Sequence, residues 1–164
     1  LQRLLNQGDE VTLCLAEDRA TFAVGNATLS TSLLQVEFPN YRQLIQPSYP
    51  NTLKVAREAL LEAVRRCRIF ARETTPVRLE MTATSLKLSV ITQDIGNSEE
   101  EIDCSLEGTE MIVGFNPEYL AAGIEAVTGD EITIQTTDPQ RPAVLRGVGA
   151  DDYLYLVMPQ RLTV

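Results

Sequence analysis

The arginines between residues 57 and 72 are the side chains best placed for chemistry, and that chemistry is contact with phosphate. This segment carries five arginines and two glutamates. At about 100° per helical residue, Arg57, Arg65, Arg68 and Arg72 fall within roughly 80° of one another, beside an apolar face. Such a stripe on an acidic protein fits loose, sequence-independent binding of a polyanion. A solvated helix face with cations favoured near its C-terminal end is the alternative, and these residues leave both open.

Missing residue types exclude most catalytic chemistry. The sequence has no histidine, which removes Ser-His-Asp and Cys-His catalysis and histidine metal ligands. Its cysteines, Cys14, Cys67 and Cys104, are too far apart for a CxxC zinc or redox motif. Each has apolar neighbours, so we expect buried, reduced thiols in a cytoplasmic protein. No pair of catalytic carboxylates stands out. The composition therefore favours a binding or scaffolding protein over an enzyme, and we expect no metal or cofactor.

Size and composition indicate an ordinary globular chain. It has 164 residues, 44% of them hydrophobic and 23% charged, enough for one domain or for one domain and part of another. Its net charge of −9 makes nonspecific DNA binding by the whole surface implausible, so any contact with a polyanion must be local. No apolar run approaches the ~20 residues of a membrane-spanning helix, and no signal peptide opens the chain.

The pattern predicts an α+β fold with many short strands. Leu1 to Gln7 looks like the end of a helix. Gly25-Asn26 is typical of a two-residue hairpin turn. A proline-rich stretch after it suits an extended linker. The strands are expected at residues 11–16, 20–24, 27–34, 52–56, 77–83, 86–92, 101–107, 111–115, 132–137, 143–147 and 153–157.

Two helices are expected among these strands. The first covers Arg57 to Arg72. The second has clear boundary signals, with Asn116 as N-cap, Pro117 at the first helical position and Gly129 as the stop.

A short repeat suggests two similar modules. Residues 8–13 (GDEVTL) recur as residues 129–134 (GDEITI), and both copies follow a predicted helix end and precede strands. Chance remains an alternative for six residues. On the repeat interpretation, residues 1–38 are the C-terminal part of one module, residues 39–50 are a linker, and residues 51–164 are a complete second module.

The C-terminus is unusually apolar for a chain end. After a strand it continues as Met158-Pro159-Gln160-Arg161-Leu162. Such an end either closes the core or lines a docking groove, where methionine offers an adaptable contact surface. The residues alone favour core closure.

Two segments together carry a family resemblance. FPNYR at 38–42 and MPQRL at 158–162 resemble the bacterial sliding clamp, the beta subunit of DNA polymerase III. Further segments that resemble this family in the same order are EAVRR at 62–66 before Ile69-Phe70, VRL at 77–79, and GFN at 114–116 with Tyr119. They cover nearly the whole chain.

This resemblance implies both an architecture and a function. Sliding clamps are head-to-tail rings of similar modules, each with two helices facing the central hole and antiparallel sheets forming the outer wall. Three modules make a subunit, and a homodimer closes the ring. The chain would be the end of the middle module and the whole C-terminal module, without the N-terminal one. It would belong to a non-catalytic processivity factor encircling double-stranded DNA, with Arg57, Arg65, Arg68 and Arg72 facing the DNA.

The resemblance also implies two contact sites. Ile69 and Phe70 match the region that meets the neighbouring subunit. A hydrophobic pocket would receive short Gln- and Leu/Phe-containing peptides from polymerase subunits, the clamp loader and repair proteins. Gln160 stands where many clamps carry an apolar residue, and Thr163-Val164 extend the usual ending. The residues that match the pocket are Pro39, Leu44, Asn116, Tyr119, Pro142, Leu156, Val157, Met158, Pro159, Gln160, Arg161 and Leu162. The alternative function is an α+β peptide-binding adaptor unrelated to DNA.

Overall fold

A three-stranded antiparallel sheet forms most of the first of two structural units in the computed structural model. The structure describes residues 1–71, 75–92, 96–150 and 153–162, and the two units are residues 1–40 and 41–164. In the first unit, the turn between the last two strands is the expected hairpin: Val24 pairs with Ala27, and Gly25 has a φ of +56° that favours glycine. The elements of this unit are η1 (Gln2–Gln7), β1 (Val11–Leu15), β2 (Arg19–Val24) and β3 (Ala27–Ser32).

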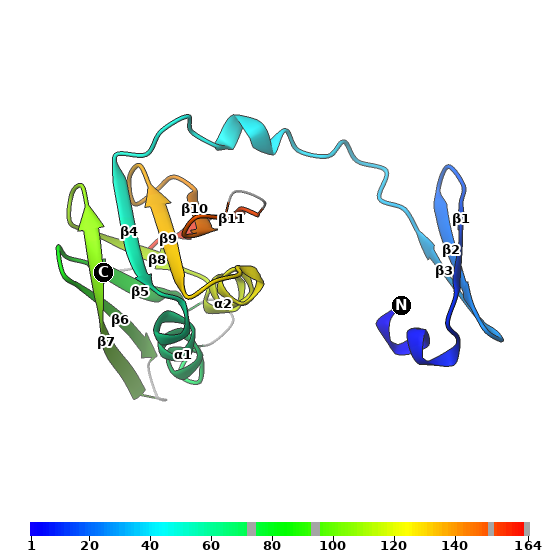
Figure 1. Cartoon of the computed structure of the whole chain (residues 1–164), viewed down its shortest axis with the longest axis horizontal. Coiled ribbons are helices and arrows are strands. Elements are labelled where there is room, and N and C mark those ends of the chain that lie inside the picture. Colours follow the sequence, from blue (N-terminus) through cyan, green and yellow to red (C-terminus); the bar gives the residue numbers. More distant parts are fainter. Residues whose placement is uncertain (72–74, 93–95, 151–152, 163–164) are drawn as a thin grey trace. The chain divides into compact units, whose positions relative to one another are not determined.

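A nine-stranded sheet and two helices form the second unit (Figure 1). Every strand pairing is antiparallel, in the order β11-β10-β9-β4-β7-β6-β5-β8-β12. The predicted α+β class, with two helices packed on antiparallel sheets, is confirmed. The elements are η2 (Tyr41–Leu44), β4 (Asn51–Ala56), α1 (Arg57–Arg68), β5 (Val77–Met81), β6 (Ser85–Thr92), β7 (Gly96–Glu107), β8 (Met111–Phe115), α2 (Pro117–Ala126), β9 (Glu131–Thr136), β10 (Ala143–Gly147), β11 (Tyr155–Val157) and β12 (Pro159–Gln160).

The long strand β7 joins the two halves of this sheet. Its first eight residues pair with β6, whereas residues 104–107 pair with β4. The acidic run 99–101 lies inside β7, which begins at Gly96, before the strand start expected at residue 101. Glu99 bonds to Lys87 on β6, and Glu100 on the other face bonds to Arg66 of α1. These partners let a run of like charges adopt an extended strand.

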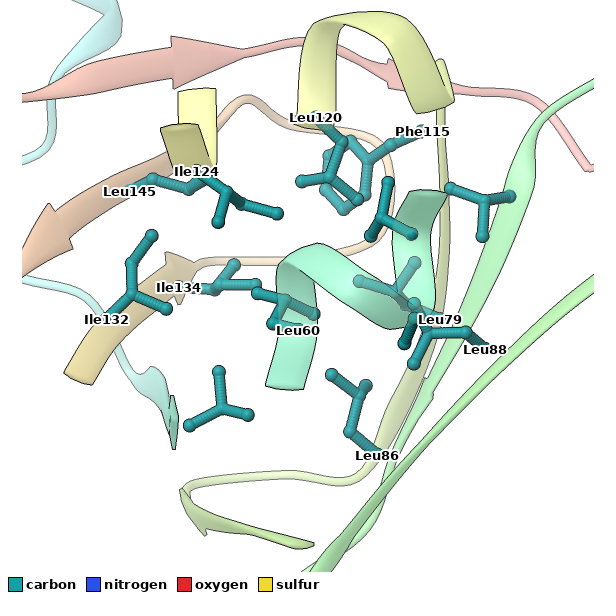
Figure 2. Close-up of a cluster of buried hydrophobic side chains, with 14 of the residues drawn as sticks. Leu60, Leu79, Leu86, Leu88, Phe115, Leu120, Ile124, Ile132, Ile134 and Leu145 are labelled. Carbon is teal, nitrogen blue, oxygen red and sulfur yellow. The ribbon is translucent and has the colours of Figure 1, made fainter. Parts of the chain in front are cut away.

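The core lies between the two helices and both halves of the sheet (Figure 2). Leu60 of α1 lies among side chains of the strands, and Leu120 and Ile124 of α2 join the same cluster. Strand residues supply the rest by strict alternation, as in β4, where Leu53 and Val55 are buried and Lys54 is exposed. This packing fixes both helices side by side, with their polar faces turned away from the core.

The C-terminal segment supplies the strands at both ends of the sheet. β11 pairs with β10 at one end of the strand order, and β12 pairs with β8 at the other end. Only Met158 separates these two strands in the sequence. Val157 is buried in the core, while Met158 is 58% exposed. The apolar chain end therefore closes the core and leaves an apolar side chain at the surface.

Several sequence predictions were wrong in detail. η1 is a 3-10 helix, α1 ends at Arg68 instead of Arg72, and α2 ends at Ala126, before Gly129. The α2 helix stops early because Val127 adopts an extended conformation and is buried. Of the three cysteines, only Cys67 is buried; Cys104 is partly exposed, and Cys14 is exposed because β1 is an edge strand with no burial on either face.

The two copies of the repeat both lead into a strand, β1 and β9, but their glycines differ. Gly8 is extended, with φ −179°, while Gly129 has φ +97°. Among the described helices, none has the length and apolar character that crossing a membrane requires.

Candidate partner-binding site and arginine face

Met158 lies at the corner where the chain passes from one sheet edge to the other. Val157 pairs with Ala143, so continuing the register places Pro142 opposite Met158 on one side. Pro159 pairs with Phe115, so the same step places Asn116 opposite Met158 on the other side. Pro142 and Asn116, which are distant in the sequence, thus both lie opposite the exposed Met158. These three are among the predicted pocket residues.

Asn116 fixes the start of α2 beside this corner. Its side-chain oxygen accepts hydrogen bonds from the backbone N–H of Glu118 at 2.8 Å and of Tyr119 at 3.4 Å. This is the predicted N-cap. Tyr119, in the first turn, is 63% exposed. The capped first turn therefore presents a large aromatic side chain at the surface.

Tyr155 continues the aromatic surface along α2. A Cβ added at Gly123 would lie 2.4 Å from the Tyr155 ring, so this glycine is what lets the ring pack against the helix. Burial, with the nearby Tyr153 and Tyr119 hydroxyls, raises the pKa of Tyr155. The ring is a neutral, half-buried contact surface.

A cavity of about 260 Å³ lies beside Pro142. It is lined by Leu44 and other residues of the η2 segment and by residues of the loop before β10. Leu44 is 42% exposed, so an apolar side chain is available at this cavity. The lining residues are Gln43, Leu44, Gln46, Thr137, Arg141 and Pro142.

A second cavity, of about 500 Å³, lies along the end of the chain. Gln160 lines it with a buried side-chain oxygen, Oε1, that has no hydrogen-bond partner among the described residues. Leu162 packs against Gly114 of β8, where an added Cβ would lie 2.7 Å from the leucine. The lining residues are Ile112, Gly114, Pro139, Gln140, Pro159, Gln160, Arg161 and Leu162.

The loop 138–142 borders both cavities and is locally braced. The Asp138 carboxylate accepts from the backbone N–H of Gln140 at 2.8 Å and of Arg141 at 3.1 Å. The Arg141 side chain returns to Asp138 at 3.3 Å. Such an Asx turn holds the loop in one shape. The sequence analysis left residues 138–142 between two expected strands and named Pro142 as a pocket residue, but it did not identify the other residues of this loop that line the cavities.

The structure thus gathers most of the predicted pocket residues. Leu44, Asn116, Pro142, Met158 and the residues after it lie around the corner or line its two cavities. Tyr119 is exposed in the first turn of α2, which Asn116 caps. Leu156 is half-buried in β11, and Val157 belongs to the core. Pro39 belongs to the first unit.

The arginines of α1 form a second surface, and each of them is held by a partner. Arg65 donates to Glu125 of α2 at 2.9 Å and to Glu62 at 3.2 Å, and these hydrogen bonds raise its pKa. Arg68 reaches Glu118 of α2 at 2.5 Å. Because residues 65 and 68 meet residues 125 and 118, the two helices run antiparallel.

Arg57 and Arg66 bond to partners outside α2. The Arg57 side chain donates to the Gly129 carbonyl at 3.0 Å, across from the start of β9. Arg66 makes a two-pronged contact with Glu100 at 2.9 Å, which holds the pKa of that carboxyl below its usual range. Arg72, also predicted to face DNA, lies outside the described residues.

The predicted subunit-contact residues differ in exposure. Ile69 is 76% exposed, whereas Phe70 is partly buried against the core. The Thr92 hydroxyl donates to the Phe70 carbonyl at 2.6 Å, which ties the end of α1 to the end of β6. Ile91, next to Thr92, is also 76% exposed. Within the described ranges, no cluster of His, Cys, Asp or Glu could hold a metal ion.

The second unit is thus a module of two helices and antiparallel strands, with an exposed methionine and two cavities beside its last strands. Residues 42–161 match the model of the DNA polymerase III beta subunit, C-terminal domain. The chain belongs to this family, the bacterial sliding clamps.

Individual relatives agree over nearly the whole chain. It is 30% identical to the beta sliding clamp of Streptomyces coelicolor and 26% identical to that of Treponema pallidum, covering 98% of this chain in both cases but only 46% and 45% of the relatives. The solved structure of the sliding clamp from Bartonella birtlesii bound to griselimycin is 27% identical, with a TM-score of 0.80 over 98% of this chain and 44% of that one. The chain thus spans slightly less than half the length of these relatives.

Proposed function

We propose that this chain forms the C-terminal part of a sliding-clamp subunit. The complete subunit would be a non-catalytic, cytoplasmic processivity factor that pairs head-to-tail into a ring around duplex DNA. Residues 1–38 would end the middle module, and residues 51–164 would be the C-terminal module. In a chain of this family, the observation that carries the proposal is the exposed Met158 corner with its two flanking cavities.

The Met158 corner is proposed to bind short peptides from polymerase subunits, the clamp loader and repair proteins. Apolar anchors would pack on Met158, Tyr119 and Leu44, all of which are exposed although they sit beside a tightly packed core. Asn116 and Gln160 would provide polar contacts at the rim. The Bartonella birtlesii clamp was solved with griselimycin bound, which supports a ligand-binding role for this fold.

A peptide titration tests this site directly. The probe is a fluorescein-labelled peptide with a glutamine followed by leucine and phenylalanine, and the readout is fluorescence anisotropy. Met158→Ala removes apolar contact worth roughly 1–2 kcal/mol, so the Kd should rise about five- to thirtyfold. Point substitution is preferable to deleting the chain end, because deletion would also remove β12 from the sheet.

The matched control is Ile91→Ala. Ile91 is more exposed than Met158 and lines neither described cavity, so its substitution should leave the Kd unchanged. Equal affinities of the Met158→Ala variant and the unmodified chain would refute the site assignment.

Arg57, Arg65, Arg68 and Arg72 are proposed to face DNA, and Ile69 with Phe70 to meet the neighbouring subunit. The polar face of α1, with its half-exposed arginines, supports the first assignment. The test uses the complete subunit loaded on DNA. Retention on closed circular DNA that disappears when the circle is cut supports the ring. Equal loss from both DNAs would favour the peptide-binding adaptor instead.

A further inference from the structure

The charges on the two helices cancel. Helix α1 contains four arginines and two glutamates, and α2 contains two glutamates and no basic residue. The pair of helices therefore has no net charge, although the sequence of α1 alone looks basic. The opposite charges of the two helices are also in direct contact, through ion pairs between α1 and α2.

The two glutamates of α2 are the counter-charges. Glu125 bonds to Arg65, and Glu118 bonds to Arg68, each across the seam between the helices. All four side chains are about half exposed, with relative exposures from 46% to 56%. The pairs are thus accessible to solvent and to a ligand approaching the helix face. A phosphate would have to compete with a carboxylate that is already in place.

We propose that Glu118 and Glu125 act as internal phosphate substitutes that weaken the hold of Arg68 and Arg65 on DNA. This inference rests on the proposed DNA-facing role of the helices. The carboxylates keep the guanidinium groups oriented along the seam and return to them when a phosphate leaves. Exposed ion pairs are weak and exchange readily, so the arginines remain available for brief contacts. The face would therefore bind duplex DNA loosely, as free movement along it requires.

The test measures how DNA binding by the complete subunit depends on salt. Neutralising both carboxylates in Glu118→Gln/Glu125→Gln should free up to two arginines for phosphate. Each additional phosphate contact steepens the slope of log K against log salt by about 0.9, so the slope should become steeper by roughly 1 to 2. The affinity at low salt should rise about three- to tenfold.

Glu99→Gln is the matched control. Glu99 also pairs with a cation, Lys87, at 2.7 Å, so the net charge changes in the same way per substitution. It precedes Glu100 in β7, and Glu100 reaches α1, so Glu99 points to the opposite face of the sheet. The salt slope of this variant should equal that of the unmodified protein. Peptide affinity at the Met158 corner should be unchanged in all variants, which separates a charge effect from a folding effect.

An arginine variant separates failure of the counter-charge inference from failure of the DNA-facing assignment. Arg65→Gln/Arg68→Gln should weaken DNA binding and flatten the slope. If it does so while the glutamate variants bind DNA no more tightly than the unmodified protein, the counter-charge inference is wrong and the DNA-facing assignment stands. If the arginine variant binds DNA with the original slope, the DNA-facing assignment itself is wrong.

Discussion

Gly114 provides the sharpest test of how the chain end is attached. In β8 it faces the C-terminal segment, where an added Cβ would lie 2.7 Å from Leu162 Cδ2 and 2.9 Å from the Gln160 carbonyl oxygen. The leucine can rotate away, but the carbonyl is backbone and belongs to β12. Gly114→Ala therefore forces β12 away from β8.

The expected loss of unfolding free energy in Gly114→Ala follows from these contacts. Overpacking of this kind costs roughly 1–3 kcal/mol. Replacing glycine by alanine in an ordinary backbone conformation also stabilises the fold by up to about 1 kcal/mol, because alanine lowers the conformational entropy of the unfolded chain. The net loss should be about 1–2 kcal/mol, or about 0.5–1 M in the urea midpoint for an m value near 2 kcal/mol/M. Peptide binding at Met158 should weaken in parallel, because Met158 immediately precedes the displaced strand.

A double-mutant cycle with Leu162→Ala provides the decisive control. Truncating Leu162 removes one of the two clashes, so the double variant should lose less stability than the sum of the single variants. The measurement is urea unfolding monitored by circular dichroism, together with the peptide titration. Additive losses would show that Leu162 does not press on Gly114, and unchanged stability in Gly114→Ala would refute the close approach altogether.

Two further predictions concern pH and thiol reactivity. The pKa of Glu100 is lowered mainly by its hydrogen bonds from Arg66. This pair therefore stabilises the fold above the usual glutamate pKa of about 4.3, and the stabilisation is lost as the pH falls through the lower pKa of the folded state. The difference in unfolding free energy between the unmodified chain and Glu100→Gln, measured by urea unfolding, should shrink in that range and be constant from pH 6 to 8. Burial raises the pKa of the Cys67 thiol, whereas Cys14 is exposed. A maleimide at pH 7.5 should therefore label Cys14 first and Cys67 only after unfolding, as followed by mass spectrometry. Equal labelling of the two thiols in the folded protein would contradict the packing of α1.

Local signals predicted the helix starts well and the helix ends poorly. Asn116 and Pro117 fix the beginning of α2 because a cap is formed by neighbouring residues. The end is decided by tertiary packing: Val127 is buried in an extended conformation, so the helix stops before the glycine. Likewise, β7 begins before the strand start expected at residue 101, because Arg66, the partner of Glu100 in this acidic part, is distant in the sequence.

The candidate site was predictable as a set of residues, but not as a geometry. Met158 stood out because an apolar chain end is unusual. That Pro142 and Asn116 flank it depends on strand pairings between segments far apart in the chain, which no local pattern reveals. The arginine stripe was visible at helical spacing, yet the glutamates that neutralise it lie on another helix. Sequence reasoning therefore overstated its positive charge.

The attachment of one short segment to both sheet edges has a consequence for the integrity of the protein. If residues 155–160 detach, β10 and β8 lose their outer partners in the same event, and two rows of backbone N–H and C=O groups become free. Unpaired edges of this kind recruit strands from other molecules. Loss of residues 155–160 would therefore leave the nine-stranded sheet with unpaired strands at both ends, which allows chains of molecules to form, whereas an unpaired strand at one end alone would allow only pairs.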